Sequence, residues 1–458
     1  MNNLRGYLLL MFVFLLAASV VSASPLSSGN AGLNVIRVPS DYSTIQEAID
    51  SASPGSMILV GSGTYHEHLM VDKTLSLLGT DRTHTIIDAD NGTTAITVTA
   101  DSVLINGFTV QNSSSDGIHV DHSNNCTISD NNITLNNIHG IFLGYSNRTI
   151  VEGNIVSLSG NYNPDLSTIW GANIALMHSC NDTISNNVVK NSFYIGIDVR
   201  DSNSNLVQGN VIEDNPISIF VYYSNLNGIY HNNFINPNVY GGGFLTGQGN
   251  SHYSQNIWYS QNIWDDGYPS GGNYWTDYTG TDSLSGPYQN ETGSDGIGDL
   301  PLAIDANNTD RYALMGLFSP FDAGTWNGTA CEVDVTSNST ISDFQVDVAH
   351  GMVNLNVTGP QSTIGFCRLT IPNIMVQDLW HGNYTVLLND EPWPFENWTD
   401  ATNTYVYFNY TQSRHGVIIV PEYPWITTLA FFAGLSTLAV ALSVKRNPRK
   451  LTTKPPTR

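Results

Sequence analysis

The stretch Ile128-Ser129-Asp130-Asn131-Asn132-Ile133 decides the fold, because variants of it recur along the middle of the chain. Its asparagine returns at spacings of 23, 33, 23 and 23 residues, in the series Asn131, Asn154, Asn187, Asn210 and Asn233. Apolar residues flank each asparagine, with Tyr230 and Ile235 around the last one. A second series of apolar pairs keeps nearly the same step: Ile118/Val120, Ile141/Leu143, Ile174/Leu176, Ile197/Val199 and Ile219/Val221. A period of this length is typical of a solenoid, and the spacing of two within each pair predicts strands, so we expect a right-handed parallel β-helix.

The balance of charges narrows the class of partner. The chain has 458 residues, which is enough for two or three domains, and a formal net charge of -23. An excess of acidic residues repels the phosphate backbone, so nucleic acid is not expected as a partner. Cations, neutral glycans and basic surfaces are the partners that this charge favours.

Both ends of the chain carry targeting patterns. Arg5 precedes an apolar run that ends in small residues, which predicts a secretory signal peptide over residues 1–23. Residues 425–444 are uncharged and long enough for a transmembrane helix, and residues 445–458 form a basic tail that we expect in the cytoplasm. The same C-terminal pattern resembles archaeal sorting signals that are cleaved and replaced by a lipid anchor. Either arrangement predicts a secreted protein held at the extracellular face of the cell membrane.

A short amphipathic helix precedes the repeats. Ile45, Ala48 and Ile49 follow helical spacing, with Ser43 as the expected N-cap. A helix in this place would cover the open apolar end of a solenoid, so we expect an N-terminal helical cap.

Three sequence words in and after this helix resemble a known family. They are Ile45-Gln46-x-Ala48-Ile49, Gly63-Thr64-Tyr65-x-Glu67 and Leu75-x-Leu77-Leu78-Gly79. They are similar to the NosD-type, carbohydrate-binding-and-sugar-hydrolase-like β-helix proteins, and the resemblance extends over about residues 36–320. It implies a pectin-lyase-like β-helix in an archaeal surface protein. It implies an activity less strongly, because one fold hosts many functions.

The expected architecture is all-β. A β-helix over 35–240 is followed by a Trp/Tyr/Gly-rich closing segment over 241–324. Alternating apolar residues between turns over 325–418 predict a small β-sandwich. This region resembles a module found before the membrane span in archaeal surface proteins, which implies that it acts as a stalk. Cys331 and Cys367 fall in this sandwich and could form a disulfide. Cys126 and Cys180 lie two turns apart in the β-helix, about 10 Å, which is too far for a disulfide.

The outer face of the strands around Ile118 is the expected binding surface. The residues that point outward there, or that follow these strands, are rich in histidine, aspartate and aromatic side chains. Aromatic faces can stack on sugar rings while carboxylates hold hydroxyl groups, although such rows also form for packing alone. The predicted ligand-binding residues are His119, Asp121, His122, Phe142, Tyr145, His178, Phe220, Tyr222 and Tyr223.

Hydrolysis or elimination of a polysaccharide is an alternative function. Two catalytic carboxylates must lie about 5 to 9.5 Å apart, and Asp198 and Asp201 share one turn of the predicted helix. Arg200 between them could serve a lyase as base. A purely structural surface or adhesion protein is a third possibility. We expect binding of a glycan or cell-envelope component without turnover.

Calcium is the candidate cofactor. Glu291, Asp295 and Asp299 offer oxygen ligands around a glycine turn, in a loop that resembles those of archaeal family members. Copper, which the family name suggests, is not expected. His178 lies about 10 Å along the axis from His122, and His66 and His68 supply two ligands at most.

Overall fold

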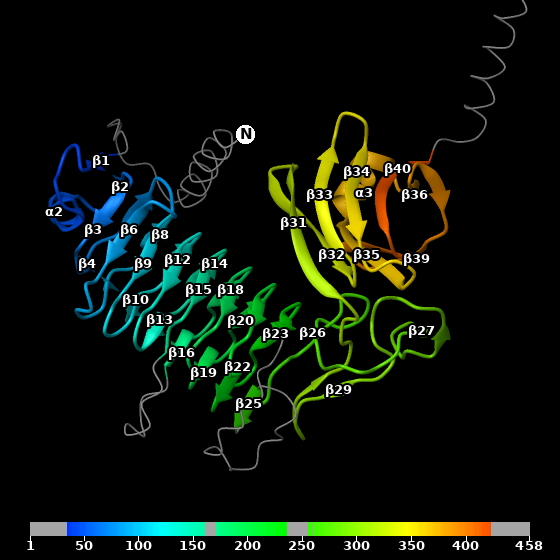
Figure 1. Cartoon of the computed structure of the whole chain (residues 1–458), viewed down its shortest axis with the longest axis horizontal. Helices are drawn as coiled ribbons and strands as arrows, with labels where there is room; N and C mark the ends of the chain where they lie inside the picture. Colours follow the sequence, from blue (N-terminus) through cyan, green and yellow to red (C-terminus); the bar gives the residue numbers. More distant parts are fainter. Residues whose placement is uncertain (1–33, 161–170, 236–254, 259, 423–458) are drawn as a thin grey trace, which may run out of the picture.

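The computed structural model describes residues 34–160, 171–235, 255–258 and 260–422 (Figure 1). Short parallel strands stack into three sheets that run along the first part of the chain. In the first sheet, neighbours in order are β1 (Val35–Val38), β2 (Ser56–Val60), β5 (Leu75–Gly79), β8 (Leu104–Asn106), β11 (Thr127–Ser129), β14 (Ile150–Glu152), β17 (Thr183–Ser185), β20 (Leu206–Gln208) and β23 (Gly228–Tyr230). The stack is therefore a parallel β-helix, as the repeats predict.

The other two sheets complete each turn. The second sheet holds β4 (Leu69–Val71), β7 (Ile96–Val98), β10 (Ile118–Asp121), β13 (His139–Gly144), β16 (Ala172–Met177), β19 (Ile195–Arg200), β22 (Ile217–Tyr222) and β25 (Gln255–Trp258). The third sheet holds β3 (Gly63–Tyr65), β6 (Thr85–Asp88), β9 (Thr109–Gln111), β12 (Asn132–Thr134), β15 (Ile155–Ser157), β18 (Val188–Lys190), β21 (Val211–Glu213), β24 (Asn233–Ile235) and β26 (Tyr274–Trp275). Each strand is short because a turn of the solenoid needs three of them.

Apolar columns fill the inside of the helix. The predicted series Ile118, Ile141, Ile174, Ile197 and Ile219 pairs strand to strand in one register, and every member is fully buried. The partners two residues further on, from Val120 to Val221, are equally buried. The predicted second-sheet pairs are thus confirmed.

Buried asparagines form a ladder beside these columns. The Oδ1 atom of Asn154 accepts the backbone N–H of Asn131 at 2.9 Å, and Asn187 does the same for Asn154 at 3.0 Å. Their side-chain amides donate to carbonyl groups on neighbouring turns, such as Asn187 to Val151 at 2.8 Å. Because each amide satisfies buried backbone groups of its neighbours, the ladder binds adjacent turns to one another.

The repeat predicts the fifth ladder position at Asn233, and the structure places Asn232 there instead. The N–H of Asn210 donates to Oδ1 of Asn232 at 3.1 Å, and the ladder then runs through Asn273 to Asp310. The turn over residues 214–216, before β22, is one residue shorter than the turn over 191–194 before β19. A slip of one residue exchanges the two faces of a strand. Ile229 and Phe234 are therefore the buried flanking residues, in place of Tyr230 and Ile235.

The helix α2 (Ile45–Ser51) lies at the start of the stack (Figure 1). Its N-cap is Thr44 rather than the predicted Ser43, since the Thr44 side chain accepts the Glu47 N–H at 3.2 Å. Ile45, Ala48 and Ile49 belong to the same buried cluster as the inner columns. The role of this helix as a cap stays a prediction.

Two antiparallel sheets form the C-terminal region. One contains β31 (Leu317–Trp326), β32 (Thr329–Ser337), β35 (Ile364–Pro372), β39 (Asn403–Thr411) and β38 (Glu396–Thr399). The other contains β33 (Thr340–Asp347), β34 (Met352–Thr358), β40 (Arg414–Pro421), β36 (Tyr384–Leu388) and β37 (Glu391–Trp393), with α3 (Asn373–Trp380) alongside. Val333 of the first sheet and Val417 of the second lie in one buried cluster, so the two sheets share a core.

Between these regions the chain forms two small hairpins. They pair β27 (Leu284–Ser285) with β28 (Glu291–Thr292), and β29 (Leu302–Ala303) with β30 (Thr309–Asp310). The side chain of Asn233 then joins the last turns of the helix to β31: it accepts the N–H of Phe318 at 2.8 Å and donates to its carbonyl at 2.7 Å. The buried Arg368 donates to the carbonyl groups of Pro269 and Ser270.

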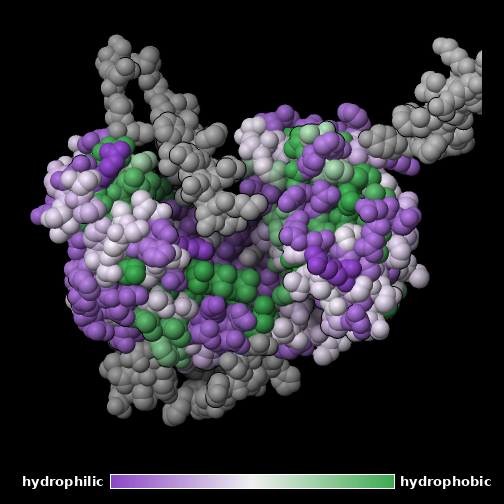
Figure 2. All heavy atoms as spheres, turned by 45° about the horizontal axis from the view of Figure 1, so that its top comes forward, coloured by the Kyte–Doolittle hydropathy of each residue, from purple (hydrophilic) through white to green (hydrophobic). Residues whose placement is uncertain are grey.

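A groove of about 450 Å³ lies beside this junction. Val188 and Val211 of the third sheet line it on one side, and Leu317 and Phe318 line it on the other. Figure 2 shows hydrophobic residues beside the hollow between the β-helix and the C-terminal sheets.

The predicted disulfide between Cys331 and Cys367 is wrong. Both thiols are free, and Cys367 pairs across the sheet with Ser337, which is six residues along β32 from Cys331. That separation is about 20 Å at the rise of a strand. Cys126 and Cys180 are also free and lie two turns apart, as predicted.

Among the described residues, no helix is long and apolar enough to cross a membrane. The predicted signal peptide over 1–23, the predicted transmembrane helix over 425–444 and the basic tail over 445–458 all lie outside the described residues.

Candidate functional site

The outer face of the second sheet carries the predicted binding residues. Its central column pairs in register as His119, Phe142, Ala175, Asp198 and Phe220. Asp198 and Phe220 are buried, while His119 and Phe142 are half-buried. Phe220 packs with Ala172, Ala175, Ile195 and Ile217 in a second hydrophobic cluster outside the helix core. This part of the face is packed and presents no open ring at Phe220.

Three rings stack at the end of the second-sheet strands, and we call His122, Tyr145 and His178 the ring ladder. Neighbouring ring centroids lie 4.6 Å apart, with interplanar angles of 13° and 18°. All three residues adopt left-handed backbone conformations, with φ of 51°, 51° and 55°. Tyr145 is 52% exposed. Because both faces of Tyr145 are covered by histidine rings, it presents its edge and hydroxyl group to solvent.

Carboxylates and a further tyrosine extend the ring ladder. His122 is hydrogen-bonded through Nδ1 to Asp121 at 2.6 Å. On the next turns Asp201 and Tyr223 follow the strands at the same place, with φ of 48° and 47°, and both are exposed. The rings of Tyr222 and Tyr223 meet at an interplanar angle of 78°, with their centroids 4.5 Å apart. The result is a row of hydroxyl, imidazole and carboxylate groups along one edge of the second sheet.

The predicted catalytic residues are only partly brought together. Arg200 donates from Nε to both carboxylate oxygens of Asp198 at 2.8 and 2.9 Å, and its Nη2 lies 2.7 Å from Oδ2. Asp201 is exposed, whereas Asp198 has no exposed surface. Burial raises the pKa of Asp198, and the neighbouring Arg200 guanidinium opposes this rise.

Asp116 and His139, at the opposite end of the same strands, were not predicted from the sequence. Asp116 accepts hydrogen bonds from Nδ1 of His119 at 2.9 Å and from Nδ1 of His139 at 2.7 Å. Burial raises the pKa of Asp116, but these two hydrogen bonds outweigh the effect of burial and lower the pKa to about 2. His139 is buried, and its Nε2 has no hydrogen-bond partner in the described part of the chain. The available signal was the 23-residue step from Asp116 to His139.

Two of the three predicted calcium ligands bind backbone groups of the protein. Asp295 is buried and accepts the N–H of Ile297 at 3.0 Å. Asp299 accepts the N–H groups of Ser283 and Leu284 at 3.0 and 2.9 Å, while Glu291 is exposed. Within the ranges that the structure describes, these residues do not form a group of three close ligands. Calcium binding here stays a prediction.

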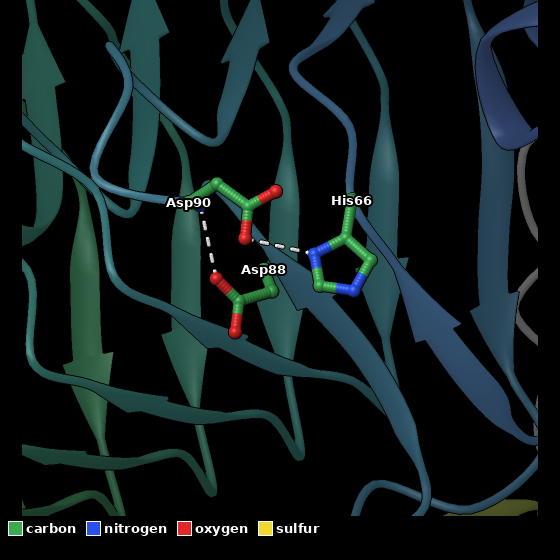
Figure 3. A group of neighbouring side chains, drawn as sticks. All are labelled: His66, Asp88 and Asp90. Carbon is green, nitrogen blue, oxygen red and sulfur yellow. Dashed lines mark hydrogen bonds and ion pairs between the residues drawn. The ribbon is translucent and has the colours of Figure 1, made fainter.

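A different group of possible ligands lies near the start of the helix. His66, Asp88 and Asp90 each place one ligand atom within 4.8 Å of the others (Figure 3). Nδ1 of His66 is hydrogen-bonded to Asp90 at 2.8 Å, and Asp88 accepts the N–H of Asp90 at 3.0 Å. Asp88 also accepts hydrogen bonds from Gln111 and Asn112 at 2.7 and 2.9 Å. The sequence reasoning found His66 but missed both carboxylates.

Sheets of eight and nine parallel strands, joined by an asparagine ladder, define a parallel β-helix protein of the solenoid class. The chain belongs to the NosD family: the family model described as "Periplasmic copper-binding protein (NosD)" matches residues 49–280, just over half of the chain.

A curated surface protein shares part of the sequence. The chain is 33% identical over 133 residues to the "Cell surface glycoprotein" of Methanothermus fervidus (strain ATCC 43054 / DSM 2088 / JCM 10308 / V24 S). The match covers 28% of this chain and 21% of the relative, so the chain spans about a fifth of the curated relative that it matches.

Solved structures with a similar shape are distant. Pectate lyase Pel9A has a TM-score of 0.39 and 11% identity, over 57% of this chain and 72% of that chain. The alginate lyase from Paenibacillus sp. str. FPU-7 has a TM-score of 0.31 and 13% identity, over 53% of this chain and 97% of that chain. At these scores the likeness carries no argument about activity.

The family description calls for a test of whether copper fits the residues present. The group in Figure 3 offers one imidazole and two carboxylates. Cu(I) prefers thiolate and thioether ligands, and this group has neither. The group therefore does not fit Cu(I).

Proposed function

We propose that the protein is an extracellular surface protein that binds a glycan or another cell-envelope polymer along the ring ladder, without turnover. The observation that carries the proposal is the exposed stack of His122, Tyr145 and His178, set at the spacing of the β-helix turns. The family description names a periplasmic protein and the relative is named a cell surface glycoprotein, which supports a location outside the cytoplasm.

A regular row of polar groups suits a polymer. Neighbouring turns repeat every ~4.7–4.9 Å along the axis, so successive turns can meet successive units of an extended chain. Since the ring faces inside the ladder cover one another, recognition would come from hydrogen bonds to the Tyr145 hydroxyl, the imidazoles and Asp121. Stacking on a sugar ring would involve Tyr223, which is 48% exposed.

We extend the proposal to the membrane. The uncharged segment over 425–444 would hold the protein at the cell surface, after removal of the signal peptide over 1–23. Separation of membranes from soluble material tests this part: the full chain should sediment with membranes, and a chain ended after Glu422 should not.

Catalysis by Asp198, Asp201 and Arg200 is the alternative. Asp198 is buried and paired with Arg200, so a substrate would have to separate this pair before it reached the carboxylate. Binding without turnover needs no such change, and we therefore favour it.

The test is an array of envelope polysaccharides, probed with the full chain and with Tyr145→Asn. Asparagine tolerates the left-handed backbone at this position, so the variant removes the ring without straining the turn. Tyr288→Asn removes an exposed tyrosine in the loop between β27 and β28, outside the second sheet, and is the control. We expect selective binding that Tyr145→Asn loses and the control keeps. Shortened products would favour the enzyme, and absence of binding would favour a structural protein.

A further inference from the structure

A second groove lies at the other end of the second-sheet strands, beside residues that directly follow β9, β12 and β15 and beside Phe193, which precedes β19. Its volume is about 550 Å³. Leu135, Leu158 and Phe193 line it together with asparagine and serine side chains, including Asn112 and Asn137. None of the described residues that line this groove carries a charge. In a chain with a net charge of -23, a groove whose described lining is uncharged is a distinct surface.

Two leucines in the groove occupy a position that suits asparagine. Leu135 and Leu158 have φ of 57° and 52°, in the left-handed region that disfavours most side chains. Asn112 and Asn191 hold the same place on other turns, with φ of 60° and 51°. Asparagine is the better residue for this backbone, so local structure does not explain the leucines.

The same leucines are also exposed to solvent. Leu135 is 49% exposed and Leu158 is 38% exposed, and the ring of Phe193 beside them is 57% exposed. Three large apolar side chains in one groove, two of them in an unfavourable backbone conformation, indicate a contact with a ligand that has an apolar face.

Backbone N–H groups around the groove are already hydrogen-bonded and are not open to a peptide. The N–H of Asn137 donates to Ser113 at 2.9 Å, that of Phe193 to Ser159 at 3.0 Å, and that of Ser114 to Gly92 at 2.6 Å. An extended peptide binds by adding backbone hydrogen bonds to an open edge, and these groups are already bonded between turns. Recognition must come from side chains.

We propose that this groove binds an uncharged oligosaccharide. The apolar faces of its sugar rings lie on Leu135, Leu158 and Phe193, and its hydroxyl groups meet the amide and hydroxyl side chains around them. Among the described residues, the lining offers a uronic acid no cation to pair with. The groove and the ring ladder follow opposite ends of the same strands, so this proposal does not rest on the function proposed for the ladder.

The test is calorimetric titration of the full chain with two panels of hexasaccharides. One panel is neutral, made of glucose, mannose, galactose or N-acetylglucosamine, and the other is oligogalacturonate. The double variant Leu135→Asn/Leu158→Asn installs the residue found on the neighbouring turns, so it should fold at least as well as the parent. Leu226→Asn is the control, because Leu226 has φ of 59° and is exposed but does not line the groove.

We expect one or more neutral hexasaccharides to bind the parent and the control equally, and the double variant at least tenfold more weakly. Oligogalacturonate should bind none of them through the groove. Equal affinity of parent and double variant would overturn the proposal, and so would failure of every neutral hexasaccharide to bind. Loss of neutral binding in Tyr145→Asn with full binding in the double variant would assign the saccharide to the ring ladder and also overturn it.

Discussion

The β-helix and the C-terminal sheets build their cores from opposite kinds of contact. In the β-helix each turn pairs with its neighbours in one parallel register, and a buried asparagine at each turn satisfies the backbone of the next. In the C-terminal sheets, strands of up to ten residues pair antiparallel, with irregular register in two hairpins. Loss of a repeated residue in the β-helix therefore disturbs the neighbouring turns as well. Loss of a residue in the C-terminal sheets disturbs mainly the contacts of that residue.

The largest expected effect comes from breaking the ladder. Asn187→Ala removes the acceptor of the Asn154 N–H and the donor to Val151, and leaves buried groups on two turns without partners. We expect a loss of about 3–5 kcal/mol in the free energy of unfolding, measured with urea. The matched change in the C-terminal region is Asn373→Ala, at the first residue of α3, where the Asn373 side chain is hydrogen-bonded to Asp400 and Thr404.

We expect Asn373→Ala to lose about 1 kcal/mol, because its side chain is only half-buried and water can replace the lost partners. Equal losses in the two variants would mean that the ladder contributes no more than ordinary side-chain hydrogen bonds.

The next effect concerns the junction between the two regions. Asn233→Leu leaves the N–H and carbonyl of Phe318 without their partners in a buried place. We expect a loss of about 2–3 kcal/mol. Hydrogen exchange should speed up at β31 and leave β10 unchanged, and equal acceleration in both strands would show that the regions unfold as one.

A smaller, pH-dependent effect is expected at Asp182. This residue holds an asparagine position in a second ladder with Asn205, where its Oδ1 accepts the N–H of Thr149 at 2.7 Å. Its Oδ2 has no hydrogen-bond partner in the described chain, and burial raises the pKa of the carboxyl to about 7. A raised pKa in the folded state stabilises the protein at low pH, and that stability is lost as the pH rises from about 4 through 7.

Asp182→Asn should remove this dependence of stability on pH, because an amide carries no charge. Its N–H₂ group can also donate a hydrogen bond to a backbone carbonyl, as the side chain of Asn205 does to Ser179. At pH 8 we expect the variant to be more stable by about 1–3 kcal/mol, and at pH 4 nearly equal to the parent. Thermal unfolding between pH 4 and 8 measures it. If the unfolding temperatures of the two proteins changed with pH in the same way, Asp182 would not be the source of the pH dependence. Asp334→Asn is the counterpart in the C-terminal sheets, since burial also raises the pKa of Asp334 to about 7.

The smallest expected effect is that of a reductant. Because all four thiols are free and Cys331 lies far from Cys367, dithiothreitol should leave the unfolding temperature unchanged. A drop of several degrees would reveal a disulfide and contradict the free state of the four thiols.

The sequence predicts the β-helix well because its period repeats. Ile118 through Ile219 fall where the spacing places them, and the predicted asparagine series fails at Asn232 and Asn233, where a turn is one residue shorter. The C-terminal sheets have no period, so alternation shows that strands exist but not which residues face each other, and the Cys331–Cys367 pairing fails for that reason.

The site was predicted less well than the fold. The columns through Asp121 and His122 are in the expected register, but spacing alone does not show that rings stack face to face or that Asp198 and Phe220 are buried. Asp116 and His139 were missed because they stand outside the apolar pairs that mark the strands. Burial and ring geometry depend on packing between turns, which one-dimensional spacing does not record.

The most direct test of the central claim is the affinity of the ring ladder for an envelope polymer. Cell-envelope polysaccharide would be titrated into the full chain, into Tyr145→Asn and into the control Tyr288→Asn. If the ladder is the binding edge, Tyr145→Asn should weaken binding at least tenfold while the control stays within twofold of the parent. Equal affinity in all three proteins would contradict the account.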